Sequence, residues 1–173
     1  MTIDFSIREA VPGDARDFAS SQVLAWRAAY AGVLDEGYLA GLNVEQLTRG
    51  WTRILGAPDV DVRRLALTAS GSTVGWSGFG VPRDDVPEGT GELHALNLHP
   101  DYWSRGLGSA LFLASVEGLR SMGYHRAYLW VADGNSRAIR FYERHGWCQD
   151  GTTKEDARFD PPLFERRLSV SLG

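Results

Sequence analysis

Cysteine and lysine are almost absent from the sequence, and the shortage of cysteine excludes several kinds of structure. Cys148 is the single cysteine among 173 residues, so the chain can form neither an internal disulfide nor a zinc cage of several thiolates. The surrounding segment GWCQDG holds no histidine or basic cluster, and we expect a small buried strand residue rather than a nucleophile. Lys154 is the only lysine, so arginine carries almost all of the positive charge.

Long apolar runs and an excess of positive charge are also missing. No segment approaches the roughly 20 apolar residues that span a bilayer. The first ten residues, MTIDFSIREA, lack the basic-then-apolar pattern of a signal peptide. The formal net charge of −4 argues against non-specific binding to nucleic acid. We therefore expect a cytoplasmic protein whose partners include neither a membrane nor nucleic acid.

The length and composition predict one globular domain over residues 1–173. Hydrophobic residues make up 43% of the chain and charged residues 23%, which suits a soluble protein able to bury a core. No metal ion is predicted, because the histidines show no ligand spacing such as His-Glu-x-x-His. These histidines are His94, His99, His125 and His145.

Hydrophobic periodicity predicts a mixed α/β fold. The first half of the chain reads as a strand, a helix, a helical region broken at Gly37 and Gly41, and a hairpin of two strands. The second half alternates strands with helices, which implies parallel strands joined by crossover helices. The predicted strands cover residues 3–10, 62–70, 73–82, 92–99, 125–133, 147–153 and 163–172, and the clearest helices cover 12–30, 107–122 and 135–146.

A glycine-containing turn opens the helix predicted at 107–122. The preceding strand runs through Pro100 into the segment RGLG, which begins at Arg105. Glycine is costly at a helix start, but helix N-termini carry unpaired amides that attract phosphates. The glycines could form a pyrophosphate site, to which Arg105 could add a charged contact. Alternatively, they only allow the helix to pack on the sheet. Neither the P-loop nor the dinucleotide fingerprint is satisfied, since Leu111 stands where the latter needs its third glycine.

Two motifs at the right separation favour the pyrophosphate site. The segments ELHALNLHPDYWSRGLGSALF and HRAYLWVADGNSRAIRFYERHGW strongly resemble the GNAT acetyltransferase family, with a detailed match over residues 92–147. The second segment fits the family pattern Asn-x-x-Ala-x-x-Phe-Tyr-Glu-x-x-Gly-aromatic. The matching positions are Asn135, Ala138, Phe141, Tyr142, Glu143, Gly146 and Trp147. The first segment departs at Trp103, where the family usually has Gln or Arg, and we expect Arg105 to supply the missing polar contact.

The resemblance implies a mixed, largely antiparallel sheet with a splayed parallel strand pair and flanking helices. It also implies direct transfer of an acetyl group from acetyl-CoA, the co-substrate, to a primary amine, without an acyl-enzyme. In that family the glycine turn holds the pyrophosphate, the strand pairs with the pantetheine, and backbone amides near Leu98 stabilise the oxyanion. The residues expected to bind acetyl-CoA are Leu96, Asn97, Leu98, Trp103, Ser104, Arg105, Gly106, Leu107, Gly108, Ser109, Asn135, Ala138 and Phe141.

Tyr142 is the expected general acid, again through the resemblance, and would protonate the departing CoA sulfur. A phenol of pKa ~10 faces a thiol of pKa ~8.5, which is a modest mismatch. The alternative is a residue on the apolar face of its helix. Glu92 is our first choice for the base that deprotonates the acceptor, and His94 the second. Strand alternation puts both on one face with Leu96 and Leu98, and for both the alternative is a solvated strand residue.

The acceptor is expected between the first helices and the hairpin. Tyr30 and Tyr38 could form an aromatic wall with Trp76 as a further contact, while Asp35 and Glu36 could attract a cationic amine. A small-molecule amine is the first choice of acceptor, and a peptide N-terminus or lysine is the alternative. The non-enzymatic alternative is a module that binds acyl-CoA without turnover. The terminal strand at 163–172 is expected to leave a sheet edge that a homodimer partner could cover.

Overall fold

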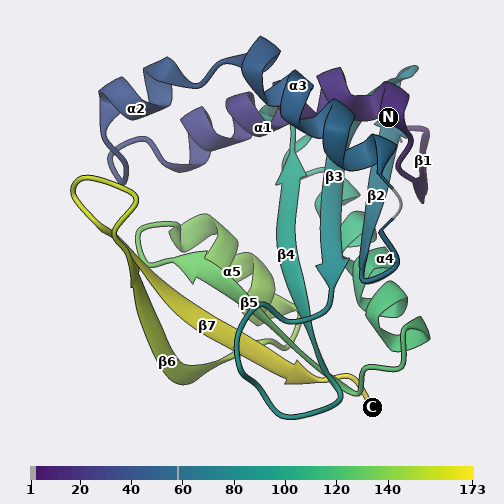
Figure 1. The fold of residues 1–173 in the computed structure, drawn as a ribbon, viewed down its shortest axis with the longest axis vertical. Helices are drawn as coiled ribbons and strands as arrows, with labels where there is room; N and C mark the ends of the chain where they lie inside the picture. Colours follow the sequence, from purple (N-terminus) through teal and green to yellow (C-terminus); the bar gives the residue numbers. More distant parts are fainter. Residues whose placement is uncertain (1–2, 58) are drawn as a thin grey trace.

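A computed structural model describes residues 3–57 and 59–173 of the chain (Figure 1). Their strands form one sheet of seven strands in the order β1-β2-β3-β4-β5-β7-β6. The strands are β1 (Phe5–Glu9), β2 (Val62–Ala69), β3 (Ser72–Gly80), β4 (Thr90–Leu98), β5 (Arg126–Ala132), β6 (Cys148–Asp156) and β7 (Leu163–Ser171). The helices are α1 (Ala15–Ala29), α2 (Glu36–Gly41), α3 (Val44–Gly56), α4 (Leu107–Ser121) and α5 (Ser136–Arg144), with short 3-10 turns at Pro12–Asp14 and Pro100–Tyr102.

The mixed, largely antiparallel sheet predicted from the resemblance is confirmed. Every neighbouring pair is antiparallel except β4 and β5, which run parallel. The hairpin of β2 and β3 turns at the predicted place, where Ser70 and Gly71 have positive φ angles of 53° and 82°. Glycine adopts this left-handed region at little cost, so the turn is encoded locally.

The order of the last strands differs from the prediction. We expected parallel pairing through both crossover helices, and this holds for β4 and β5 but not for β5 and β6. Strand β7 returns antiparallel and inserts between them. The predicted sheet edge at 163–172 is therefore wrong, because β7 is paired on both sides and β6 forms that edge. A strand order of this kind depends on pairing between distant segments, which periodicity does not report.

Cys148 lies at the start of this edge strand and is exposed rather than buried. Because β6 has a neighbour on one side only, most of its first half faces solvent. The predicted strand position is right and the predicted burial is wrong.

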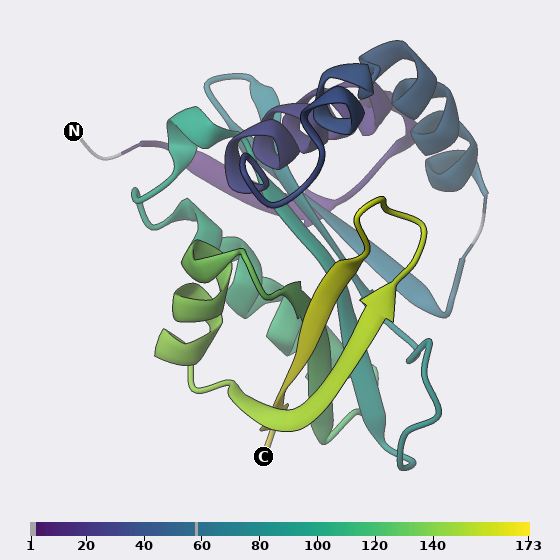
Figure 2. The same cartoon turned by 90° about the vertical axis from the view of Figure 1, so that its left-hand side faces the viewer.

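Helices cover both faces of the sheet (Figure 1). Helices α1 and α3 pack on one face around Phe18, Ala66 and Trp76, while α4 and α5 pack on the other against the largest group of buried side chains. Figure 2 shows the loop between β6 and β7 reaching toward the helices of the first half of the chain. A smaller apolar cluster joins α2 and the segment before it to β5 and β7. Its buried members are Leu34, Leu39, Ala132 and Leu163.

Strand β4 contains a bulge at its centre. Gly78 of β3 pairs with Ala95, but the next residue, Phe79, pairs with Leu93, so His94 is an additional residue on β4. A bulge bends the strand and interrupts the regular alternation of its side chains.

The bulge overturns one prediction about side-chain orientation. Simple alternation placed Glu92, His94, Leu96 and Leu98 on the same face of the strand. In the structure Leu96 and Leu98 instead share the α4 face with Leu93. The two polar residues precede or occupy the bulge and are therefore out of phase with the leucines that follow.

Candidate active site

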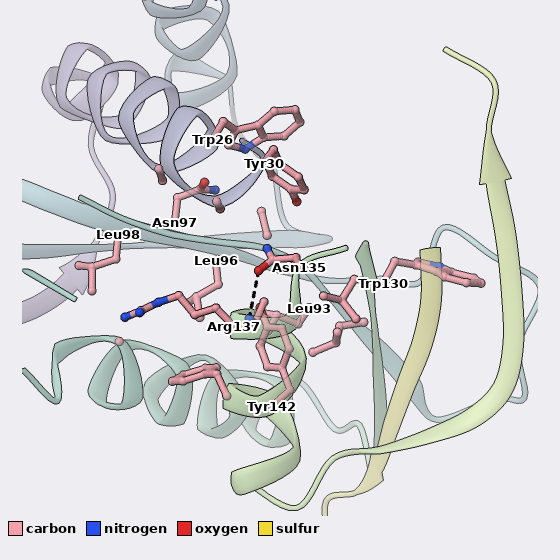
Figure 3. A pocket seen from close by; sticks show the side chains of 18 of the residues that line it. Trp26, Tyr30, Leu93, Leu96, Asn97, Leu98, Trp130, Asn135, Arg137 and Tyr142 are labelled. Carbon is pink, nitrogen blue, oxygen red and sulfur yellow. Dashed lines mark hydrogen bonds between the residues drawn. The ribbon is translucent and has the colours of Figure 1, made fainter. Parts of the chain in front are cut away.

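A cavity of about 580 Å³ opens where β4 and β5 separate (Figure 3). The two strands pair over three residues, from Thr90 with Arg126 to Glu92 with Tyr128, and then diverge. The strand segments beyond this point, Leu93–Leu98 of β4 and Leu129–Val131 of β5, line the cavity together with side chains of α1 and α5. Splaying of the parallel pair thus leaves backbone groups of β4 facing a cavity rather than a neighbouring strand.

The predicted glycine turn borders one end of this cavity. Gly106 caps α4 in the left-handed conformation, with φ of 84°, which by itself favours glycine at this position. A Cβ atom there would meet nothing within 4 Å, so the space in front of the helix start is open. The first amides of α4 have no partner within the helix and suit an anion. At Gly108 a Cβ would make ordinary contact with Leu98 and Phe141.

Trp103 anchors the turn at the position where the sequence departs from the family pattern. Its indole Nε1–H donates to the Leu98 carbonyl at 2.7 Å, and the Arg137 guanidinium lies over its ring, 4.5 Å from the centroid. Arg137 also donates from Nη2 to the Ser104 hydroxyl at 3.1 Å. We had expected Arg105 to supply a polar contact here, but Arg137 is the arginine that lines the cavity beside Trp103.

Most residues predicted to bind acetyl-CoA meet on the cavity wall. Leu107 does not, because it is 2% exposed and belongs to the core under α4. Arg105 is exposed and also lies outside the lining. The predicted residues that do line it are Leu96, Asn97, Leu98, Trp103, Ser104, Gly106, Gly108, Ser109, Asn135, Ala138 and Phe141.

Tyr142 and Asn135 bring α5 to the middle of the cavity (Figure 3). The Asn135 side chain caps the helix by accepting from the Ala138 amide at 3.1 Å, a role that Asn often has at an N-cap. The Tyr142 ring is half-buried, and its centroid lies 5.7 Å from that of Phe112 and 5.3 Å from that of Phe141. The ring is thus held by packing on the apolar side of α5 while the residue also lines the cavity.

Tyr30 of the segment after α1 faces the same part of the cavity. Burial raises the pKa of the Tyr142 phenol, and the nearby Tyr30 adds to the rise. Burial also raises the pKa of the Tyr30 phenol, while the polar Asn135 side chain opposes that rise. Both phenols therefore keep their protons at neutral pH, as a general acid must.

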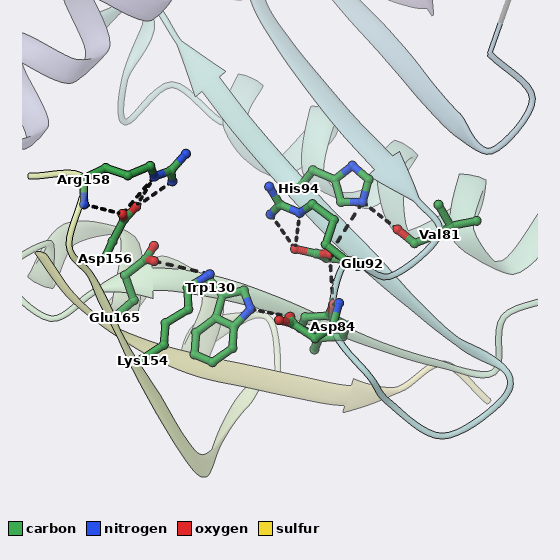
Figure 4. A network of polar contacts seen from close by, with 11 residues as sticks. Val81, Asp84, Glu92, His94, Trp130, Lys154, Asp156, Arg158 and Glu165 are labelled. Carbon is green, nitrogen blue, oxygen red and sulfur yellow. Dashed lines mark hydrogen bonds and ion pairs between the residues drawn. The ribbon is translucent and has the colours of Figure 1, made fainter.

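Glu92 lies outside the cavity lining in a buried network of polar contacts (Figure 4). The Arg83 side chain donates to Oε1 from Nε at 3.0 Å and Nη2 at 2.5 Å, and the Tyr128 hydroxyl donates to Oε2 at 2.9 Å. Burial by itself raises the pKa of the carboxyl, but the hydrogen bonds and the charge of Arg83 outweigh burial and hold it below the usual range. Both carboxylate oxygens have partners, so direct contact between Glu92 and an acceptor is blocked.

His94 lines the cavity beside this network. Its Nε2 lies 2.8 Å from the Val81 carbonyl, which can only accept, so Nε2 carries the proton and Nδ1 keeps its lone pair in the neutral ring. The Glu92 carboxylate lies 3.6 Å from the same nitrogen. Burial lowers the pKa of His94, against the opposing effects of the Val81 carbonyl and the Glu92 charge. The imidazole is therefore neutral at pH 7 and can accept a proton.

The residues predicted for the acceptor divide into two groups. Tyr30 and Trp76 line the cavity, although Trp76 is 3% exposed and stacks on Phe18 with centroids 5.1 Å apart. Asp35, Glu36 and Tyr38 lie outside the lining.

These three residues form the start of α2 instead. The Asp35 carboxylate caps α2 by accepting from the Tyr38 amide at 2.8 Å. The Tyr38 ring packs edge-on against Phe159 of the β6–β7 loop, with centroids 5.1 Å apart. Tyr38 therefore supports a residue of the cavity wall, since Phe159 does line it.

Sequence reasoning missed five charged residues, together with Trp130 of β5, at the end of the cavity far from the glycine turn. They come from β6, β7 and the loops before β4 and β7, around the Trp130 ring (Figure 4). Alternation in the segment TTKEDAR was the one signal that could have placed two of them on a common face. The missed residues are Arg83, Trp130, Lys154, Asp156, Arg158 and Glu165.

Residues 3–57 and 59–173 hold no helix with the length and apolar character needed to cross a bilayer. In the same ranges, no three His, Cys, Asp or Glu side chains gather in a way that could hold a metal ion.

Comparison with known proteins identifies the family of this chain. A family model described as acetyltransferase (GNAT) family matches residues 25–147. The chain is 30% identical over 141 residues to YuaI, an uncharacterised N-acetyltransferase of Bacillus subtilis, covering 81% of this chain and 78% of the relative. The protein belongs to the GNAT acetyltransferase family, as its motifs predicted.

Other similar proteins extend the comparison. The mycothiol acetyltransferase of Pseudarthrobacter chlorophenolicus is 28% identical over 150 residues, and the match covers 83% of this chain but only 42% of that enzyme. The crystal structure of the PaiA N-acetyltransferase from Thermoplasma acidophilum in complex with coenzyme A superposes with a TM-score of 0.76, at 20% identity, covering 98% of this chain and 99% of that one. The structure of YncA from Salmonella typhimurium with acetyl-CoA gives a TM-score of 0.68 at 18% identity, covering 98% and 95%.

Proposed function

We propose that the protein transfers the acetyl group of acetyl-CoA directly to a primary amine of a small molecule. The observation that carries this proposal is one continuous cavity that touches three features. It joins an open, glycine-capped helix start to a half-buried, protonated phenol, Tyr142, and to a neutral imidazole, His94. An acyl donor and an amine can approach one another in such a space from its two ends.

The residues at the glycine turn fit acetyl-CoA. The unpaired amides of α4 and the open space at Gly106 suit its pyrophosphate, and Arg137 supplies a cation beside them. The backbone of β4 that faces the cavity could pair with the pantetheine amides as an added strand would. When bound, acetyl-CoA supplies a thioester, whose carbonyl carbon is the electrophile. The PaiA and YncA structures, which hold CoA and acetyl-CoA, support this choice of donor through their shared fold.

Tyr142 acts as the general acid in this proposal. The neutral acceptor nitrogen forms a bond to the carbonyl carbon, the carbon–sulfur bond breaks, and Tyr142 gives its phenolic proton to the departing thiolate. The bonded nitrogen then loses its extra proton to the Tyr142 phenolate, which leaves the amide and restores the phenol. The phenol carries its proton at neutral pH, since the pKa of Tyr142 is raised rather than lowered from the ordinary value of ~10. Tyr30 and Asn135 flank Tyr142 across the cavity and would hold it in position (Figure 3).

His94 takes the proton that the acceptor ammonium must lose, directly or through a water molecule. It is the group of the Glu92–His94 pair that lines the cavity, and its Nδ1 lone pair is available. Glu92 becomes a positioning residue, because its carboxylate holds Arg83 and Tyr128 and lies behind His94. The sequence favoured Glu92 as the base and His94 as the second choice. In this proposal His94 is the base and Glu92 positions it.

The contact between Tyr38 and Phe159 supports a small acceptor over a peptide. It links α2 with the β6–β7 loop beside the acceptor end of the cavity, where a peptide substrate would need an open groove. A peptide acceptor remains the alternative. It would be favoured if peptides but not small amines were acetylated.

The test is acetyl-CoA-dependent release of free CoA thiol across polyamines, aminoglycosides, amino acids and short peptides, with products verified by mass. The Tyr142→Phe variant is the control. An amine that is acetylated by the wild type and far more slowly by the variant would support both the activity and the acid. Binding of acetyl-CoA without turnover on any amine would instead identify an acyl-CoA-binding module.

A further inference from the structure

Three ion pairs stand at the end of the cavity that the glycine turn does not occupy, and all three have the same orientation (Figure 4). In each pair the carboxylate is the inner partner and the cation the outer one. The side chains of Arg83 and Glu92 are 59% and 0% exposed, those of Arg158 and Asp156 are 86% and 11%, and those of Lys154 and Glu165 are 39% and 17%. A ligand that enters this end therefore meets cations first.

Two of the inner carboxylates, Asp156 and Glu92, have little capacity left to bind a ligand, whereas Glu165 contacts Lys154 through Oε2 alone, at 3.4 Å. Both oxygens of Asp156 accept from Arg158, at distances of 2.5 to 3.1 Å, and Arg158 lowers the pKa of this carboxyl to about 2. Both oxygens of Glu92 also have partners. Asp156 and Glu92 therefore hold their arginines in place, and an ammonium group would have to break an existing ion pair to reach either acid.

The outer cations do have capacity left. Arg83 and Arg158 each bind their carboxylate through Nε and Nη2, so the Nη1 end of each guanidinium takes no part in the pair. The Lys154 ammonium lies 3.4 Å from Glu165 and 4.2 Å from the centroid of the Trp130 ring, and its other donors are not used by this contact. Guanidinium and ammonium donors are the groups that bind carboxylate and phosphate oxygens.

From this arrangement, and resting on the proposed acetyl transfer, we infer that the acceptor is an amine that also carries an anionic oxygen group, a carboxylate or a phosphate. The anionic group binds the outer cations Arg83, Lys154 and Arg158, and the amine extends from there toward His94 and Tyr142. Acceptors that carry only positive charge are disfavoured, because they meet like charges first. Asp35 and Glu36, which we expected to attract a cationic amine, lie outside this cavity.

The experiment compares acceptors that share a short alkyl chain and differ in their second group. Butylamine, 4-aminobutanoate and 1,4-diaminobutane form one set, ethanolamine with phosphoethanolamine forms a second, and alaninamide with alanine forms a third. We expect kcat/KM for the carboxylate or phosphate member to exceed that of its neutral partner about tenfold or more, as for a charged hydrogen bond in a partly shielded site. The carboxylate and phosphate members distinguish the two forms of the anion.

Variants at the outer cations link the preference to these residues. Lys154→Gln and Arg158→Gln should bring the ratio of kcat/KM for anionic over neutral acceptors down toward one. Arg16→Gln serves as the matched control, because Arg16 pairs with Glu45 on the surface and lies outside the cavity lining. The ratio in this control should equal that of the wild type.

Three further outcomes separate this inference from the proposed function. Efficient acetylation of butylamine or 1,4-diaminobutane, without preference for the anionic partner, would overturn the inference and leave the acetyl transfer intact. A preference that persists unchanged in both cavity variants would also overturn it. Absence of turnover on any amine, with acetyl-CoA shown to bind, would overturn the proposed function and with it the inference.

Discussion

Removal of a single oxygen atom, in Tyr142→Phe, separates the chemical role of the residue from its structural one. The ring packs between Phe112 and Phe141, with centroids 5.7 and 5.3 Å away, and phenylalanine preserves these contacts. The hydroxyl belongs to a residue of the cavity wall, so its loss should change the free energy of unfolding by no more than about 1 kcal/mol. The effect on catalysis should be much larger.

The loss of a general acid typically slows the chemical step by about 10²-fold or more. A factor of 10² corresponds to about 2.7 kcal/mol of transition-state free energy. We therefore expect kcat to fall by at least this factor while the dissociation constant of acetyl-CoA changes by less than about threefold, since the proposed phosphate site lies at the other side of the cavity.

The assay measures initial rates of thiol release at saturating acetyl-CoA, together with calorimetric titration of acetyl-CoA and urea unfolding of both proteins. Unfolding provides the control for a damaged fold. A variant that keeps its stability and its affinity for acetyl-CoA and also keeps kcat would remove Tyr142 from the mechanism. A fall in kcat accompanied by an equal loss of acetyl-CoA binding would assign the residue to the donor site instead.

Three other changes test the turn, the network and the base. Gly106→Asp should weaken acetyl-CoA binding about tenfold or more relative to Gly106→Asn. Both residues tolerate the left-handed φ of 84°, but only the carboxylate repels the pyrophosphate. Equal affinities of the two variants, measured by calorimetry, would show that the turn is only structural. Glu92→Gln should destabilise the fold at pH 7 by about 1–3 kcal/mol, since Arg83 loses its partner but stays partly solvated. The pKa of Glu92 is lower in the folded protein than in the unfolded chain, where it is ~4.3. The ionised carboxylate therefore stabilises the fold fully above pH ~4.3, and this stabilisation is lost as the pH falls through the folded-state pKa. The free energy of unfolding of the variant, measured in urea, should accordingly fall less steeply with decreasing pH than that of the wild type. His94→Gln should lower kcat/KM about tenfold or more at pH 7. It should also abolish the fall in kcat/KM that protonation of His94 causes below pH ~6.5 in the wild type. An unchanged pH profile of kcat/KM would argue against His94 as the base.

Much of the fold and half of the site could be predicted from the sequence, because these features are encoded within short segments. Alternating and helical periodicities located the strands and helices to within a few residues. The turn at Gly106 and the motif from Asn135 to Trp147 each lie within one helix or at its start, where local spacing determines which side chains share a face. The residues expected to hold acetyl-CoA meet on one wall for the same reason, with Arg105 and Leu107 as the exceptions.

The tertiary structure decided what depends on pairing between distant segments. The bulge at His94 arises from the register of β4 against β3, and it separates this residue and Glu92 from the leucines that follow. The insertion of β7 between β5 and β6 brings Glu165 beside Lys154, and the ion pair of Glu92 with Arg83 joins a strand to a loop. A charge in a sequence carries no information about its partner or its exposure. The orientation of the acceptor end, with acids inside and cations outside, therefore emerges only when the strands are assembled around the cavity.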